Sequence, residues 1–410
     1  MPVQLLYHLV PPSPQFLLLS VPLLFSFTYL FFLSFFSIPL TPLQPSSPLL
    51  LLPNRYVTSA LLHKLSSTWP HLHTIILYDN SEDEISTWED LSKEWAQFKY
   101  LETIALLRCP SVVLDTLQNI IKCCPSLKCV ICPSISFGRE HFLALMTSGQ
   151  SYTELTLHNC IQIDDDAVHY VCQTLPTALD HLNSLQVLDL DSLQLLTDVG
   201  ILPILQVCSN LKSLDIGGSQ LTDRTGLFIG QHLLGLERLS IYSCSHMTDG
   251  SLLAFAALKN LRQLCLGGSS HFTSKGLEMF FLQLAANKDS EPDTHPEMDT
   301  LELTEFEDHI DSPLLVLGQK FPGLRHLDLS SCSELTAAGL DAIARHCMSL
   351  VTLRLDYVKC PHHKPILGMA FPQLRYLSLY LSDLLDDEEM QQLKRTRPWL
   401  EIDAYIGLHS

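Results

Sequence analysis

Apolar residues recur along this chain at a regular interval, most often of 24–26 residues, from Leu72 to Trp399. The clearest unit is Leu324-x-x-Leu327-x-Leu329-x-x-Cys332, in which apolar and polar positions alternate as in a short half-buried strand. Units start at 72, 101, 127, 152, 185, 211, 236, 261, 298, 324, 350 and 374. Twelve self-similar units predict a solenoid, because each unit can bury its apolar face only by stacking on its neighbours.

A helix is predicted to follow each strand and turn. In the unit that starts at Leu324, Thr336 can cap a helix whose Leu340, Ile343 and Cys347 lie on one face at helical spacing. Capping Thr-Asp pairs recur at Thr197-Asp198, Thr222-Asp223 and Thr248-Asp249. We therefore predict one α/β solenoid over roughly residues 57–405, a right-handed horseshoe with parallel strands on its concave face and helices outside.

Two units are longer than the period. The 33-residue unit from Tyr152 carries an extra segment, Pro176–Asn183. The 37-residue unit from Leu261 carries Asn287–Glu297, which is polar, contains proline and is predicted to be a surface loop. The chain closes with Asp386–Glu389 and Leu400–Asp403, a polar helix and a last strand suited to capping an exposed end.

The first 54 residues differ from the rest in composition, since no Asp, Glu, Lys or Arg precedes Arg55. Phe16–Phe36 is a run of 21 uncharged residues, long enough for a membrane anchor that would leave the repeats facing the cytosol. Phe, Leu, Ser and Pro make up 36 of the 43 residues from Pro11 to Pro53, which is also what translated polypyrimidine DNA yields. An anchor and a misassigned first exon both stay open, and a signal peptide is disfavoured. Residues 55–71 are assigned to a cap or linker helix and residues 72–410 to the solenoid with its C-terminal cap.

The charge balance bears on the class of partner. Acidic residues outnumber basic ones 44 to 25, for a net charge of −19. Binding to phosphate backbones requires clustered Lys and Arg, so no nucleic-acid partner is expected. The balance favours a protein partner with a basic segment.

The thirteen cysteines indicate a reducing compartment rather than disulfides. Most follow the repeat, such as Cys109, Cys160, Cys244 and Cys332 at position nine, so they are predicted to be small buried apolar groups. There is no N-x-S/T glycosylation site in the chain. We expect the repeats to lie in the cytoplasm or the nucleus.

Motifs for metal binding or catalysis are weak. Cys123, Cys124, Cys129 and Cys132 have a spacing similar to that of zinc ligands, but Cys124 and Cys132 hold periodic apolar positions while Cys129 would point outward. Cys360-Pro-His362-His363 has no evident fourth ligand. Phosphate-binding, nucleophile-elbow and zinc-protease motifs do not occur. No metal, cofactor or enzymatic activity is predicted.

The unit length, the cysteine at position nine and the Thr197-Asp198-Val-Gly200-Ile201 stretch resemble the cysteine-containing class of leucine-rich repeats over about residues 72–400. Such repeats are found chiefly in F-box/leucine-rich-repeat proteins, the substrate receptors of Skp–cullin–F-box ubiquitin ligases. The resemblance implies a substrate-recognition subunit in ubiquitin-dependent protein degradation. The F-box motif itself is not found, so a Skp-type adaptor and a cullin are implied only if an F-box lies upstream. The alternative is a leucine-rich-repeat adaptor outside ubiquitination, tethered to a membrane through residues 16–36.

The concave face is the predicted partner-binding surface, because repeat positions three, five, seven and eight point into it. The residues at these positions form an acidic stripe with basic residues and tyrosines: Glu154, Asp189, Asp191, Asp215, Arg238, Tyr242, Glu302, Glu305, His326, Asp328, Arg354, Asp356, Tyr357, Tyr376 and Tyr380. Tyrosine and arginine bordered by solvated carboxylates are typical of interaction hot spots. The competing interpretation is that this charge only confers solubility.

Overall fold

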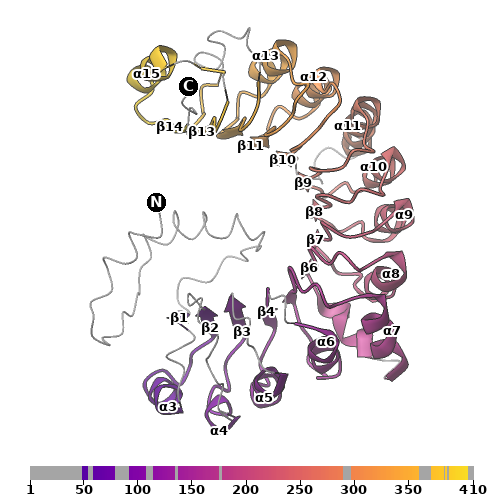
Figure 1. The fold of residues 1–410 in the computed structure, drawn as a ribbon, viewed down its shortest axis with the longest axis vertical. Helices are drawn as coiled ribbons and strands as arrows, with labels where there is room; N and C mark the ends of the chain where they lie inside the picture. Colours follow the sequence, from indigo (N-terminus) through magenta and orange to yellow (C-terminus); the bar gives the residue numbers. More distant parts are fainter. Residues whose placement is uncertain are drawn as a thin grey trace.

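The chain forms a curved solenoid in this computed structural model, which describes residues 49–53, 59–78, 92–107, 114–133, 137–174, 178–289, 297–359, 371–382, 384–385 and 387–404. One parallel sheet of 14 strands lines its inner side, and helices cover the outer side (Figure 1). The strands are hydrogen-bonded in sequence order from β1 to β14. The predicted α/β leucine-rich-repeat solenoid, with parallel strands on the concave face and helices outside, is confirmed.

Each of the strands β2 to β13 begins two residues after the start of its unit, as the apolar periodicity predicts. The strands are β1 (Leu49–Pro53), β2 (Thr74–Tyr78), β3 (Thr103–Leu107), β4 (Cys129–Ile131), β5 (Glu154–Thr156), β6 (Val187–Asp189), β7 (Ser213–Asp215), β8 (Arg238–Ser240), β9 (Gln263–Cys265), β10 (Thr300–Glu302), β11 (His326–Asp328), β12 (Thr352–Arg354), β13 (Tyr376–Ser378) and β14 (Glu401–Asp403). Two of them, β1 and β14, extend the sheet beyond the twelve periodic units.

Helices follow most strands on the outside of the curve. They are α3 (Ser59–Thr68), α4 (Ser92–Trp95), α5 (Leu114–Cys123), α6 (Arg139–Met146), α7 (Asp165–Thr174), η2 (Ala178–Ser184, a 3₁₀ helix), α8 (Asp198–Val207), α9 (Asp223–His232), α10 (Asp249–Phe255), α11 (Ser274–Asp289), α12 (Asp311–Lys320), α13 (Ala337–His346) and α15 (Asp387–Thr396). The helix expected at the N-terminal end is α3, which buries Leu61, Leu62 and Leu65 in the same core as the repeats.

The core runs unbroken between sheet and helices. In the unit of β11, Leu324, Leu327 and Leu329 are at most 1% exposed. Position-nine cysteines add to this core, and the thiols of Cys244 and Cys332 donate to backbone carbonyls of the preceding unit at 3.3 and 2.8 Å. Burial raises the pKa of both thiols to about 12, so these cysteines are packing groups rather than nucleophiles.

Side chains of consecutive units are joined by a hydrogen-bonded ladder at the helix N-termini. Thr222 caps α9, because the backbone N–H of Arg224 donates to its Oγ1 at 3.2 Å. The backbone N–H and the hydroxyl of Thr222 donate in turn to Asp198 of the preceding unit, at 3.0 and 2.5 Å. The same link joins Asp165 to Thr197, Asp223 to Thr248, Asp249 to Thr273 and Asp311 to Thr336. The Thr-Asp pairs therefore cap one helix and hold the next unit.

A second repeated feature is a left-handed backbone position. At repeat position eight, φ lies between 51° and 67° in nine consecutive units. The column comprises Asn159, Ser192, Gly218, Ser243, Gly268, Glu305, Ser331, Tyr357 and Leu381. Small or polar residues accept this conformation most readily, so Tyr357 and Leu381 are unusual members.

The extra segments of the two longer units both contain helical residues. Residues 178–183 of the first insertion belong to η2, while 176–177 lie outside the described residues. In the second, Asn287 and Lys288 continue α11 because their side chains donate to Ala256 O at 2.9 Å and Leu261 O at 3.0 Å. The surface-loop prediction is therefore wrong for the first three residues of that segment, and 290–296 lie outside the described residues.

The cysteines with zinc-like spacing, Cys123 to Cys132, are packing residues of the solenoid rather than one cluster. Cys124 and Cys132 lie in the main core, and Cys129 packs on the concave side beside Ile131. Within the described residues, no group of three or more His, Cys, Asp or Glu side chains could hold a metal ion. Nor does any described helix have the length and apolar character needed to cross a bilayer. Cys109, Cys360, His362, His363 and the run 16–36 lie outside the described residues.

Candidate functional site

The concave face carries the side chains at repeat positions three and five, because the leucine between them points into the core. Asp189 on β6 lies directly beside Asp215 on β7. Glu302 on β10 lies beside Asp328 on β11 in the same way. Between the two pairs, β8 and β9 place Ser240 and Cys265 at the same position. The acidic residues at repeat position five of strands β6 to β11 therefore form two separate pairs on the concave face.

The first pair belongs to a group that we call the central acidic cluster: Glu154, Asp189, Asp191 and Asp215. Three of its members are buried, with Glu154 6%, Asp189 1% and Asp215 7% exposed. Burial raises the pKa of Glu154 to about 7. Burial and the charge of Asp191 raise the pKa of Asp215 to about 7, and burial and the charge of Asp215 raise that of Asp189 well above its ordinary value. These carboxyl groups are therefore largely shielded from water, unlike the solvated acidic stripe expected if the charge only conferred solubility.

The fourth member of the cluster has a basic partner. Asp191 Oδ2 lies 2.8 Å from Nδ1 of His158, which holds repeat position seven in the unit of β5. Burial opposes ionisation of Asp191, but hydrogen bonds from His158 and Ser192 outweigh it and lower its pKa. The His158–Asp191 pair is half-buried and borders the buried carboxyl groups, since the backbone N–H of Asp191 donates to Asp189 Oδ1 at 3.0 Å.

A tyrosine bridges two units in the middle of the face. The hydroxyl of Tyr242 donates to Glu305 Oε1 at 2.8 Å across the intervening unit of β9. That unit has Gly267 at position seven, and a Cβ there would lie 2.8 Å from the Tyr242 ring and 2.1 Å from Thr304 Oγ1. The missing side chain gives Tyr242 room to reach Glu305. Nearby, Arg238 Nε donates to Gln263 Oε1 at 2.6 Å.

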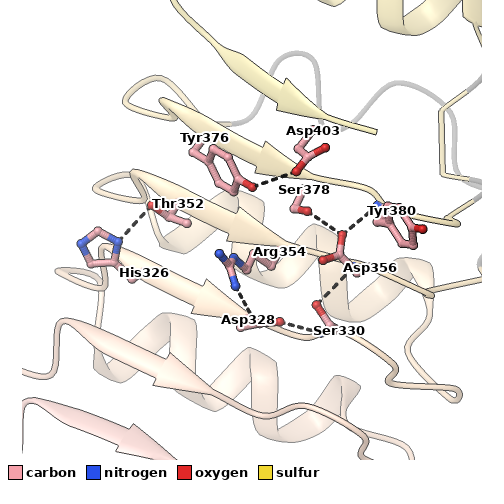
Figure 2. A network of polar contacts seen from close by, with 10 residues as sticks. All are labelled: His326, Asp328, Ser330, Thr352, Arg354, Asp356, Tyr376, Ser378, Tyr380 and Asp403. Atoms are coloured by element: carbon pink, nitrogen blue, oxygen red, sulfur yellow. Dashed lines mark hydrogen bonds and ion pairs between the residues drawn. The ribbon is translucent and has the colours of Figure 1, made fainter. Parts of the chain in front are cut away.

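The C-terminal half carries an arginine between an acid and an aromatic ring (Figure 2). Arg354 on β12 lies 3.9 Å from Asp328 Oδ2, and its guanidinium carbon lies 5.8 Å from the centre of the Tyr376 ring. The hydroxyl of Tyr376 donates to Asp403 at 3.4 Å. His326 Nδ1 is 3.0 Å from Thr352 Oγ1. Four consecutive strands thus contribute to one polar and aromatic network.

Asp356 organises the loop edge of that network (Figure 2). Its Oδ1 accepts from Ser378 Oγ at 2.6 Å and from the backbone N–H of Tyr380 at 2.7 Å. These bonds hold Tyr380 against Tyr357, with ring centres 5.7 Å apart in an edge-on arrangement. Tyr357 is 52% and Tyr380 39% exposed, so both rings offer area to a partner.

Several functional neighbours were not identified from the sequence. His158 and Gly267 hold position seven, which was known to face inward, but only the side chains of adjacent units show what they do. Ser330, Thr352 and Ser378 connect the larger residues of Figure 2 and have no distinctive pattern of their own. The arrangement offers cation recognition at the central acidic cluster and aromatic contact at the C-terminal end.

Comparison with known proteins supports the fold alone. No family model matches the sequence, and no curated protein matches it. Among solved structures, a chain of the yeast Rad7–Elc1 complex aligns with TM-score 0.59 and 17% identity, covering 84% of this chain and 88% of that one. An internalin of Listeria monocytogenes aligns with TM-score 0.46 and 15% identity, covering 86% and 89%. A leucine-rich-repeat protein of Leptospira interrogans aligns with TM-score 0.41 and 16% identity, covering 86% and 87%.

Proposed function

We propose that this chain is a non-catalytic recognition protein that holds a protein partner on its concave face. The observation that carries the proposal is the combination on that face of exposed tyrosines, a placed arginine and buried carboxyl groups. Figure 2 shows the arginine, Arg354, beside the Tyr376 ring. Tyrosine and arginine are the residues on which interface energy concentrates. A solenoid also presents its inner strands as one extended surface, which suits a protein more than a small molecule.

The more specific role that we propose is that of a substrate receptor in a Skp–cullin–F-box type ubiquitin ligase. The support is the repeat class to which the sequence is similar, together with the likeness in fold to a chain solved as part of the Rad7–Elc1 complex. A leucine-rich-repeat adaptor outside ubiquitination is the second candidate, because the same exposed tyrosines and arginine on the concave face would serve it equally.

The test is purification of the tagged full-length chain from its own cells, in parallel with a Tyr357→Ala/Tyr380→Ala variant. A ligase receptor brings down a Skp-type adaptor and a cullin with both forms, because neither tyrosine serves the adaptor. Its substrates come down only with the unaltered chain, and their half-lives lengthen when the chain is depleted. Partners that depend on the tyrosines, with no adaptor or cullin and no change of half-life, support the second candidate. Partners that bind both forms equally contradict recognition through this part of the concave face.

A further inference from the structure

Three strands bring buried carboxyl and hydroxyl groups together in the middle of the concave face. The register aligns Thr156 on β5, Asp189 on β6 and Asp215 on β7 side by side. Neighbouring strands are about 4.8 Å apart, so side chains at aligned positions are in reach of one another. Glu154 lies two residues before Thr156 and faces the same side of the sheet, since Leu155 between them points into the core. All four residues are at most 7% exposed.

Two polar atoms in this group have unused hydrogen-bonding capacity. Asp189 Oδ1 accepts from the backbone N–H of Asp191 at 3.0 Å, but the buried Oδ2 has no hydrogen-bond partner among the described residues. The buried Oγ1 of Thr156, on the adjacent strand, has none there either. An unsatisfied buried polar atom costs about 1–3 kcal/mol, and more where the group is charged. A carboxylate oxygen without a donor is a site where a donor from outside would be bound favourably.

Within the described residues, no Lys or Arg forms an ion pair with Glu154, Asp189 or Asp215. The nearest arginine along the sheet, Arg238 on β8, directs its Nε to Gln263 instead. His158 lies against Asp191 at the border of the group. Three buried carboxyl groups therefore share one place on the face without a Lys or Arg ion pair among the described residues, and the nearby charge of Arg238 acts on Asp215 alone of the three.

We propose that Thr156, Asp189, Asp215 and Glu154 form a subsite that receives one Lys or Arg side chain of a protein partner. This deepens, and rests on, the proposed recognition function. The ammonium or guanidinium group donates to Asp189 Oδ2 and places its charge beside Asp215 and Glu154. A metal ion does not suit the place, since no described group of ligands could hold one.

The experiment compares binding of labelled hexaarginine and hexalysine peptides to the full-length chain at physiological salt. The test variant is Asp189→Asn, which keeps the shape of the side chain and replaces the carboxyl group with an amide that cannot ionise. The matched control is Glu388→Gln, which also replaces a carboxyl group with an amide, at an exposed position of α15. Asp189→Asn is expected to weaken binding of the preferred peptide at least tenfold, and Glu388→Gln less than twofold. Equal losses in the two variants overturn the subsite, because binding would then follow net charge alone.

Thermal unfolding keeps the test decisive if a variant folds poorly. A buried carboxyl group whose oxygen has no hydrogen-bond partner destabilises the free protein. Asp189→Asn should therefore raise the Tm. The preferred peptide should raise the Tm of the unaltered chain and leave that of Asp189→Asn unchanged. A second variant, Asp215→Asn, should behave in the same direction. A Tm lowered by both substitutions, or protection of the unaltered chain by Mg²⁺ or Ca²⁺ equal to that by the peptide, overturns the proposal.

The subsite and the recognition function fail separately. If the peptides bind through Asp189 while cellular partners bind the Tyr357→Ala/Tyr380→Ala variant as tightly as the unaltered chain, the subsite is supported and the recognition function is contradicted. If partners depend on Tyr357 and Tyr380 but bind Asp189→Asn as tightly as the unaltered chain, the subsite falls alone.

Discussion

At the scale of the residue, Tyr357 combines backbone strain with exposure. Its φ of 59° lies in the left-handed region, which costs a residue with a side chain roughly 1–2 kcal/mol relative to the right-handed one. Its ring packs on Tyr380, and an aromatic pair returns about 0.5–1.5 kcal/mol. The two effects nearly cancel, so the tyrosine contributes little to folding, and its exposed ring is available for a partner.

We therefore predict that Tyr357→Gly changes the free energy of unfolding by less than about 1 kcal/mol, because the relief of strain offsets the lost ring contact. The same substitution should speed dissociation of a partner bound to the concave face at least fivefold. Urea unfolding and surface plasmon resonance measure the two effects. Ser331→Gly, in the same backbone column but without a ring, is the control and should leave dissociation unchanged. An unaltered dissociation rate for Tyr357→Gly would count against the tyrosine as a contact.

Gly267 is a second position where one residue decides the local surface. In Gly267→Ala the new methyl group would meet Thr304 Oγ1 and the Tyr242 ring, so the ring must move and its bond to Glu305 should break. We expect a loss of about 1–3 kcal/mol in the free energy of unfolding, the usual cost of overpacking. Gly235→Ala is the control, because its methyl group would meet only Leu211 O at 3.6 Å. Equal stability of the two variants in urea would show that Tyr242 is not held in this way.

At the scale of the element, the Asp–Thr ladder fixes each helix to the one before it. Asp198 accepts from the backbone N–H and hydroxyl of Thr222 and from the hydroxyl of Thr225, which is fully buried. The ladder stops after Thr273 and after Thr336, where Ser274 and Ala337 replace the aspartate. Consecutive bonds of this kind thus link helices α7 to α11, whereas the later helices that the structure describes have one such bond, between Asp311 and Thr336.

Asp198→Ala should therefore lower the free energy of unfolding by about 1–3 kcal/mol, because it leaves the buried Thr225 hydroxyl unsatisfied. Asp387→Ala controls for the helix dipole alone, since Asp387 is exposed in the first turn of α15. That effect is about 0.3–1 kcal/mol. Hydrogen exchange at the Thr222 amide should also accelerate in Asp198→Ala. A stability loss no greater than that of Asp387→Ala would mean that the ladder adds nothing.

At the scale of the whole molecule, two sets of carboxyl groups respond to pH in opposite directions. Burial would raise the pKa of Asp198 and Asp223, but the hydrogen bonds of the ladder outweigh it and lower their pKa. Their contribution to the free energy of unfolding is present above the pKa of the unfolded chain, about 4. It is lost as the pH falls through the lower pKa of the folded state. Glu154, Asp189 and Asp215 have raised pKa values, beside Asp191, His158 and Arg238, so the folded state holds protons that the unfolded chain has released. The contribution of these three groups to the free energy of unfolding is present below about pH 4 and is lost as the pH rises toward about 7.

We predict that the free energy of unfolding falls between about pH 4 and pH 7, and that Glu154→Gln reduces this fall by on the order of 2 kcal/mol. The amide has no proton to lose, so it removes the contribution of one raised carboxyl group. Glu401→Gln, an exposed residue at the equivalent position of β14, should leave the slope unchanged. Urea titrations at several pH values measure the effect, and parallel curves for Glu154→Gln and the unaltered chain would contradict it.

Much of the fold can be predicted from short-range patterns in the sequence. The start of each of the twelve units, the strand two residues later and the inward cysteine follow from spacings within about ten residues, which any single repeat displays. The helix caps were also predicted, since a Thr-Asp pair before an apolar stripe is a local signal. The continuation of α11 through Asn287 and Lys288 was not, because the carbonyls that hold it belong to the unit before.

The concave surface was determined only in part by the sequence. Repeat position alone placed the acidic, basic and aromatic side chains on one face of the sheet. The tertiary structure decided that Asp189 and Asp215 are buried together, that Tyr242 reaches Glu305 over Gly267, and that Asp356 holds Tyr380 against Tyr357. The physical reason is that these contacts join residues from different units, 23 to 63 positions apart. Their burial and charge depend on which side chains the stacking of units sets beside them, and no single repeat contains that information.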